Sequence, residues 1–66
     1  MQITLNGQLT ELADRFTLDA LVQQLRLTQS RIAIELNGEI IPRSQAAHTE
    51  VKPGDRVEIV HAIGGG

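Results

Sequence analysis

Apolar and polar residues alternate in two segments of the chain, Met1–Leu5 and Ile32–Leu36, as they do in strands with one buried face. Asn-Gly follows each segment. This dipeptide favours a two-residue type I′ hairpin turn, because both central residues of that turn have positive φ. The sequence therefore predicts two hairpins. Their returning strands cover Gln8–Leu12 and Glu39–Ile41, and Pro42 ends the second because proline cannot donate to a ladder.

A helix is predicted between the two hairpins. Thr17 is placed to be its N-cap, and Asp19 lies near the positive end of the helix dipole. We expect the helix to end near Arg26 and the segment Leu27–Arg31 to be a polar connection. Four apolar residues at helical spacing form one stripe that can face a core: Leu18, Leu21, Val22 and Leu25.

The last third of the chain predicts one more strand. Ser44–His48 is expected to form a short helical turn, and Lys52–Asp55 has the proline and glycine chemistry of a tight turn. Arg56–Ile63 then forms the final strand, with Val57 and Ile59 on one face.

The predicted order is hairpin, helix, hairpin and final strand, in a single small domain of 66 residues. A helix in so short a chain has to cover one face of the sheet. The final strand is expected to pair in parallel with the first at the centre of the sheet. The fold class is then α+β: a β-grasp, or ubiquitin-like, domain over residues 1–63 with a mixed sheet of four to five strands, followed by a flexible glycine tail over residues 64–66.

Composition narrows the possible functions. The net charge is −2, and the chain has one aromatic residue and no cysteine. The acidic balance disfavours nucleic-acid binding. The lack of cysteine excludes disulfides, thiolate metal sites and a cysteine nucleophile, and it is compatible with the cytoplasmic location that we expect. We expect no signal peptide and no membrane span, because no apolar run approaches the required length.

The chain ends in Gly64, Gly65 and Gly66, and this tail is the candidate functional site. Glycine lacks Cβ, so the tail fits a narrow channel in a partner enzyme, and fully extended it spans roughly 10 Å. A terminal carboxyl has an ordinary pKa of about 3.3–3.7 and is ionised at neutral pH. Attack on the α-phosphate of ATP would give an acyl-adenylate that a sulfur nucleophile displaces. The ordinary alternative is a frayed terminus or a cloning remnant.

Residues before the tail are candidates for partner docking. Val60 and Ala62 or Ile63 are expected on or near the exposed side, beside the reactive terminus. Ordinary edge packing is the alternative. Arg43 could contact carboxylates of a partner, although a solvated charge is the simpler interpretation.

No catalytic set is evident. His48 and His61 have no spacing that brings them together with carboxylates, so we expect no metal site. The acidic residues are scattered, and so short a chain has little room for a deep enclosed pocket. The chain is expected to act as a carrier and co-substrate and not as an enzyme.

Three segments resemble the ThiS family, the sulfur-carrier proteins of thiamine biosynthesis. They are Leu36–Arg43, Pro53–Val60 and Gly64–Gly66, and together with the length they extend the resemblance over essentially the whole chain. The resemblance implies that an E1-like ThiF enzyme adenylates Gly66 with ATP and Mg²⁺, and that a cysteine desulfurase system supplies sulfur for a thiocarboxylate. It also implies delivery to the thiazole synthase ThiG, with no cofactor bound to the carrier.

The sequence leaves three alternatives open. The small subunit of molybdopterin synthase also ends in Gly-Gly, although that group tends to be longer and commonly has a bulky aromatic residue and prolines before the tail. A ubiquitin-like modifier would link Gly66 to lysines of other proteins. A non-covalent β-grasp binding module would not need the tail.

Overall fold

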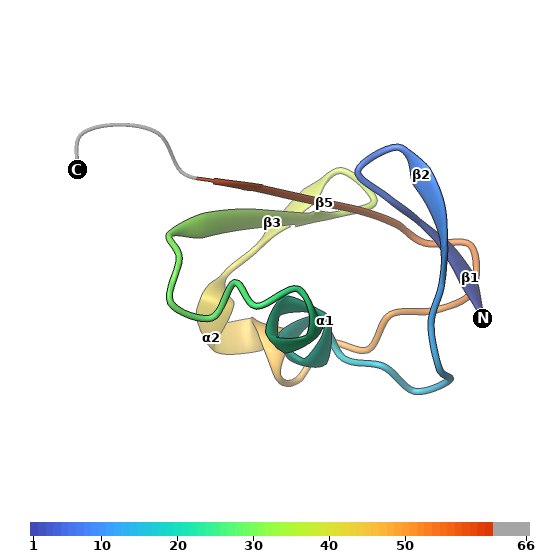
Figure 1. Cartoon of the computed structure of the whole chain (residues 1–66), viewed down its shortest axis with the longest axis horizontal. Coiled ribbons are helices and arrows are strands. Elements are labelled where there is room, and N and C mark those ends of the chain that lie inside the picture. Colours follow the sequence, from blue (N-terminus) through green and yellow to red (C-terminus); the bar gives the residue numbers. More distant parts are fainter. Residues whose placement is uncertain (62–66) are drawn as a thin grey trace.

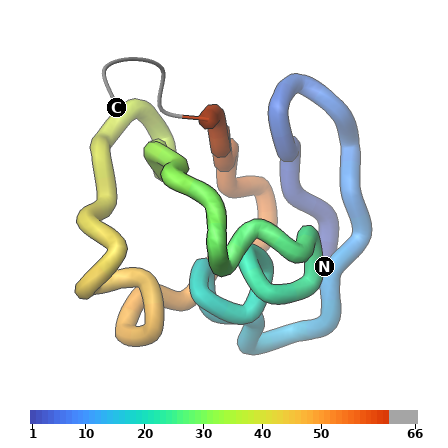
Figure 2. The backbone as a smooth tube through the Cα atoms, turned by 60° about the vertical axis from the view of Figure 1, so that its left-hand side comes forward, coloured from blue at the N-terminus to red at the C-terminus, as the bar shows by residue number. Residues whose placement is uncertain are grey.

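The computed structural model describes residues 1–61 and contains one sheet with two short helices (Figure 1). The strands are β1 (Gln2–Leu5), β2 (Gln8–Glu11), β3 (Ile32–Leu36), β4 (Glu39–Ile41) and β5 (Arg56–His61). The helices are α1 (Leu18–Gln24) and α2 (Arg43–Ala46). Both helices lie on the same side of the sheet (Figures 1 and 2).

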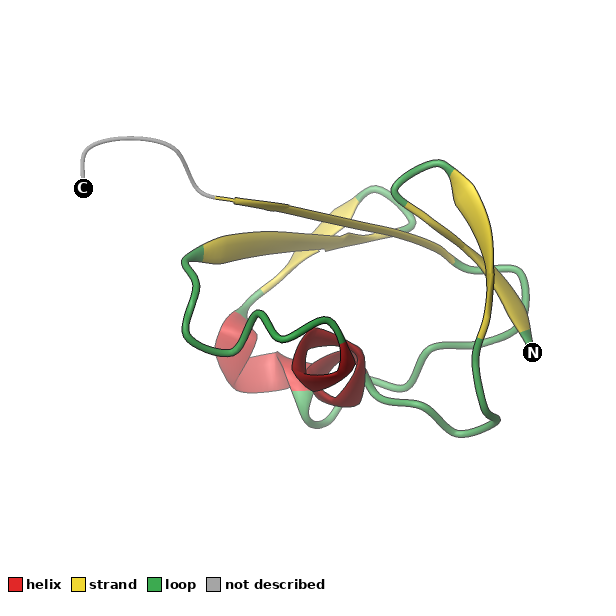
Figure 3. Ribbon diagram, viewed as in Figure 1, coloured by secondary structure: helices red, strands yellow, loops and turns green. Residues whose placement is uncertain are grey.

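The five strands have the order β2-β1-β5-β3-β4, with β5 at the centre (Figure 3). β5 runs parallel to β1, where Thr4 is opposite Arg56 and Leu5 is opposite Val57. It runs antiparallel to β3 over five residue pairs. The predicted mixed sheet, with the final strand parallel to the first at the centre, is confirmed, and the architecture is the expected β-grasp fold.

Both hairpin turns have the predicted conformation. Asn6 and Gly7 have φ of 50° and 83°, and Asn37 and Gly38 have φ of 52° and 89°. Positive φ at both central positions is what a type I′ turn requires, and asparagine and glycine adopt it more readily than other residues.

The core lies between the helices and the sheet. Val57 and Ile59 are buried on one face of β5, as predicted. Leu25 was expected in the buried helical stripe, but its side chain is 37% exposed because α1 ends at Gln24 and Leu25 is the C-cap. The ten buried apolar residues are Ile3, Leu12, Leu18, Leu21, Val22, Ile34, Ala46, Val51, Val57 and Ile59.

The C-terminus of α1 explains why the following connection is not simply polar. Arg26 has φ of 61°, its N–H donates to Gln23 C=O at 3.0 Å, and Leu27 N–H donates to Val22 C=O at 3.0 Å. This is the double hydrogen bond of a Schellman motif. The motif turns Leu27 back onto the core, where it is partly buried, so the prediction of a polar connection is wrong at this residue.

Other boundaries differ by one or two residues. β1 begins at Gln2 instead of Met1, and α2 spans Arg43–Ala46 instead of Ser44–His48. β2 ends at Glu11, but Leu12 is still buried, because its backbone N–H donates to Met1 C=O at 2.8 Å and holds the strand end against the core. The predicted end of the last strand, beyond His61, lies outside the described residues. Among residues 1–61, no helix is long and apolar enough to cross a membrane.

Candidate functional site

β5 is the element that leads to the predicted tail, and His61 is its last residue. The predicted tail residues Gly64, Gly65 and Gly66, and the docking candidates Ala62 and Ile63, lie outside the described residues. The described part of the site is therefore β5, which precedes these residues, and the surface around that strand.

The Asn6 side chain extends the pairing of β5 beyond the end of β1. Asn6 N–H donates to Val57 C=O at 2.9 Å. Its side-chain Nδ2 donates to Ile59 C=O at 3.2 Å, and Ile59 N–H donates to Asn6 Oδ1 at 2.8 Å. The carboxamide thus supplies one donor and one acceptor, as a strand residue would, after β1 has turned away into its hairpin.

The start of β5 is held by the other hairpin asparagine. Arg56 N–H donates to Asn37 Oδ1 at 2.8 Å, and Asn37 Nδ2 donates to Asp55 Oδ1 at 3.0 Å. The second carboxylate oxygen of Asp55 accepts from Lys52 N–H at 2.8 Å, which confirms its predicted turn role. Both asparagines were expected to be structural through their turns alone. Their contacts with β5 were not predicted. The two partners are 53 positions apart for Asn6 and 19 for Asn37, and local sequence patterns do not indicate contacts over such separations.

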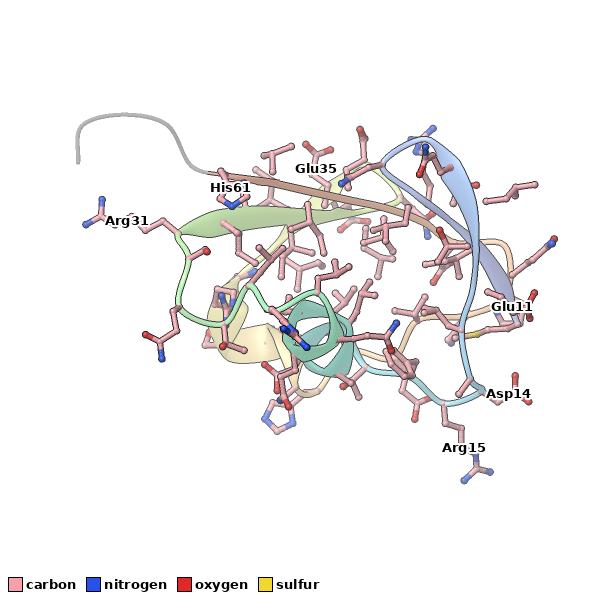
Figure 4. All side chains as sticks on the ribbon, in the orientation of Figure 1. Glu11, Asp14, Arg15, Arg31, Glu35 and His61 are labelled. Carbon is pink, nitrogen blue, oxygen red and sulfur yellow. The ribbon has the colours of Figure 1, made fainter. Side chains whose placement is uncertain are left out.

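The sheet surface opposite the helices, which we call the outer face, has exposed side chains along β5. Val60 is 55% exposed, as predicted for a docking residue. Register places Val60 opposite Ala33, Glu58 opposite Glu35, and Glu35 opposite Ile40 on β4. Opposite residues point to the same side of a sheet, and Figure 4 shows Glu35 pointing away from the helices.

Arg43 does not join this surface. It is the first residue of α2, which lies on the side of the sheet that α1 also covers (Figure 1). Strand alternation in β5 places Val60 on the outer face. The structure therefore separates two residues that the sequence analysis grouped as docking candidates.

Comparison with known proteins identifies the family. The model of the ThiS family matches residues 3–66 of the chain. The chain belongs to the ThiS family. The sulfur carrier protein ThiS of Escherichia coli (strain K12) is 36% identical over the full length of both proteins. A crystal structure of the thiamine biosynthesis protein ThiS from Geobacter metallireducens has a TM-score of 0.87 and 35% identity, and the match covers all of both chains.

A longer type of relative is also similar to this ThiS-family chain. The thiazole synthase of Paramagnetospirillum magneticum is 38% identical over all 66 residues. The match covers only 20% of that protein, so the chain spans a fifth of this relative's length.

The histidines and acidic side chains of residues 1–61 were also weighed in the sequence analysis, and the structure places each of them. Residues 1–61 contain no cluster of three or more histidine, cysteine or acidic side chains that could hold a metal ion. His48 lies at an open depression of about 600 Å³ lined also by Asn37 and Lys52, near the start of β5, whereas His61 is at the other end of that strand. The acidic residues are not all scattered, however, because the sheet brings Glu35 and Glu58 together.

The N-terminal ammonium group has the one pKa that is shifted within the described chain. Its nitrogen lies 3.0 Å from Glu11 Oε2 and 3.6 Å from Asp14 Oδ1, and it donates to Leu12 C=O at 2.6 Å. The hydrogen bond with Glu11, aided by the negative charges of Glu11 and Asp14, raises the pKa of this ammonium above its ordinary value of 8.0. The contact ties the start of β1 to the end of β2.

Proposed function

We propose that this chain carries sulfur as a thiocarboxylate on Gly66 and donates it to a ThiG-type thiazole synthase. The observation that supports the proposal most is the family match, which continues through residue 66 and so includes the glycine tail. The fold is consistent with a carrier, because β5 is hydrogen-bonded on both sides and gives the tail a fixed origin.

The proposed loading has two steps. An oxygen of the Gly66 carboxylate attacks the α-phosphorus of ATP, and pyrophosphate leaves with the bonding electrons of the broken P–O bond. A sulfide-level nucleophile then attacks the acyl carbon, a C–S bond forms, and AMP leaves. The ATP, Mg²⁺ and catalytic groups belong to a ThiF-type adenylating enzyme. In the cell a cysteine desulfurase system supplies the sulfur as a persulfide, and a thiol that is oxidised to a disulfide reduces this sulfur to the sulfide level.

The thiazole synthase partner is supported by sequence similarity within longer proteins. The relatives from Paramagnetospirillum magneticum and Magnetococcus marinus are named thiazole synthases, and in both the chain matches 20% of the length. In these two proteins, a segment similar to this chain is therefore part of the same polypeptide as the remaining four fifths of the sequence. Covalent linkage of this kind raises the effective concentration of two modules that act together.

The test is loading of the purified chain in vitro. The chain is incubated with a ThiF-type enzyme, ATP, Mg²⁺ and sodium sulfide, and its intact mass is measured. We expect the mass increase of one oxygen-to-sulfur exchange, and no increase when ATP is omitted.

The matched control carries one extra alanine after Gly66. This variant keeps the domain and the three glycines but moves the carboxylate onto another residue, so we expect it to stay unmodified. Equal modification of the extended variant, or an unchanged mass of the wild type in the complete mixture, contradicts the proposal.

A further inference from the structure

Two carboxylates lie directly opposite each other on the outer face. Glu58 on the central strand is paired in register with Glu35 on β3. The Cβ atoms of opposite residues in an antiparallel pair are about 4.5–5.5 Å apart, and like charges at this spacing destabilise a sheet. Neither carboxylate forms an ion pair or a side-chain hydrogen bond with any of the described residues.

A cation from the same chain is near but does not neutralise the pair. Arg56 is two residues before Glu58 on β5, so its side chain is on the same face, opposite Thr4 of β1. It forms no ion pair with Glu58 or Glu35. Within residues 1–61, the acidic pair therefore has no ion-pair partner, although Arg56 lies on the same face of β5.

Exposed apolar side chains flank this acidic pair. Ile40, on the other side of Glu35, is 72% exposed, and Val60, next on the outer face of β5, is 55% exposed. Scattered exposed apolar residues are ordinary on protein surfaces. Here the register places Ile40 beside Glu35, and Val60 beside Ala33 on the same face. The two carboxylates are therefore bordered by apolar side chains from three neighbouring strands, β4, β3 and β5.

The pair is also close to the tail along the chain. Gly66 is eight residues after Glu58. Eight residues of fully extended chain span at most roughly 25 Å, so Gly66 lies no farther than this from Glu58. One partner protein can therefore contact the outer face and receive the chain terminus in the same complex. A second copy of this chain does not fit the same surface, because stacking two outer faces would bring four carboxylates together.

We propose that the outer face is a docking surface for a partner that presents a guanidinium group, surrounded by apolar side chains, to Glu35 and Glu58. Arginine fits because its planar fork donates to two carboxylates at once. Ile40 and Val60 exclude water from around that contact. On the proposed function, on which this inference rests, the partner is the enzyme that adenylates Gly66.

Docking and fold stability should respond in opposite directions to one change. In the double variant Glu35→Gln with Glu58→Gln, the repulsion within the sheet is removed, so we expect the Tm of the isolated chain to rise by about 1–5 °C. The same variant has lost the charge that pairs with the partner. A purely structural role for the two residues would not produce this opposition.

The experiment compares wild type and double variant as substrates of a ThiF-type enzyme. We expect the KM for the carrier to rise about tenfold or more with kcat unchanged, because the docking charges take no part in the bond changes at the Gly66 carboxylate. The salt dependence of KM should also become weaker. A Kd measured by calorimetry without ATP should rise with the KM.

Glu39→Gln is the matched control. This substitution on β4 also replaces a carboxylate by a neutral amide. Glu39 is not on the outer face, because its register partner Leu36 faces the core. We expect its KM to equal that of the wild type. An effect of equal size in this control would show that net charge, and not the outer face, determines binding.

The outcomes separate this inference from the proposed function. If the wild type is adenylated and the double variant has the same KM and Kd, the docking surface is wrong. If the wild type binds the enzyme without being adenylated, and the double variant binds more weakly, the surface is right and the proposed function is wrong. If the wild type neither binds nor reacts, both are overturned. A concentration-dependent dimer in sedimentation, abolished by Val60→Asp, would assign the face to a second copy and overturn the inference.

Discussion

At the scale of single residues, Asn6 has two roles, one in the first hairpin turn and one in the pairing of β5. Its backbone has φ of 50° in the first hairpin turn, and its carboxamide pairs with both backbone groups of Ile59. The first property suits asparagine because its short polar side chain tolerates the left-handed region. The second makes the hairpin turn part of the central sheet ladder.

Substitution of Asn6 can separate these two contributions. In Asn6→Gly the turn conformation is retained and only the carboxamide is lost, so we expect a loss of about 1–2 kcal/mol in the free energy of unfolding. Asn6→Ala adds the strain of positive φ, and we expect a loss of about 2–4 kcal/mol. Urea unfolding of both variants measures the difference. A glycine variant as stable as the wild type would show that the contacts with Ile59 contribute nothing.

At the scale of elements, α1 depends on its packing against the sheet. It has only seven residues, and isolated helices of that length are unstable in water. Its cap is local, since Ala20 N–H donates to Thr17 Oγ1 at 3.1 Å, but its buried side chains contact the sheet core. The helix should therefore form only together with the sheet.

Two leucines on the helix test this dependence. Leu21 is fully buried, and Leu21→Ala should lower the free energy of unfolding by about 2–5 kcal/mol, because it leaves a cavity in the core. Leu25→Ala removes the same atoms at a side chain that is 37% exposed, and we expect a loss below about 1 kcal/mol. Urea denaturation followed by circular dichroism measures both. Equal losses would mean that Leu25 is as important to the core as Leu21.

The sequence predicted the elements whose signals are local. The two Asn-Gly turns, the Thr17 cap and the alternation in β3 each lie within a few residues, and each is confirmed. Burial of Leu12 and Leu27 was not predicted. It depends on how the chain turns back toward the core directly after β2 and after α1.

Parts of the candidate site were equally beyond local patterns. The tail was predicted from three glycines directly after the last strand and from the family resemblance, and it stays a prediction because it lies outside the described residues. The Glu35–Glu58 pair depends on the register between two strands that are not consecutive in the chain, and no spacing in the sequence specifies that register. Val60 was predicted correctly because strand alternation alone decides which face it takes.

At the scale of the whole molecule, the apolar core and the candidate docking surface lie on opposite faces of the sheet. The ten buried apolar residues all lie between Ile3 and Ile59. On β5, Val57 and Ile59 point to the core, whereas Glu58 and Val60 point to the outer face. Changes at the docking surface can therefore be made without disturbing the core.

The stability of the whole 66-residue chain should depend on pH above neutrality. The ammonium of Met1 has a pKa raised above 8.0 in the folded state, chiefly by Glu11. A group with a raised folded pKa stabilises the fold fully below its unfolded pKa, and that contribution is lost as the pH rises through the folded value. We therefore expect Tm to fall from pH 7 to pH values above about 8.

Glu11→Gln provides the comparison for this pH dependence. It removes the main cause of the raised pKa, so the fall in Tm above neutrality should be smaller, while Glu50→Gln should leave it unchanged. Thermal unfolding by circular dichroism at a series of pH values measures all three proteins. If wild type and Glu11→Gln have parallel profiles, the ammonium contact does not contribute to stability.

The parallel pairing of β1 and β5 has a mechanical consequence. One strand begins near Met1 and the other leads to the C-terminus, and both run in the same direction. A pull applied between the two termini therefore slides these strands lengthwise past each other and loads their hydrogen bonds together, instead of opening them one at a time. A force that a partner enzyme applies to the C-terminus would therefore act on all the hydrogen bonds between β1 and β5 at the same time.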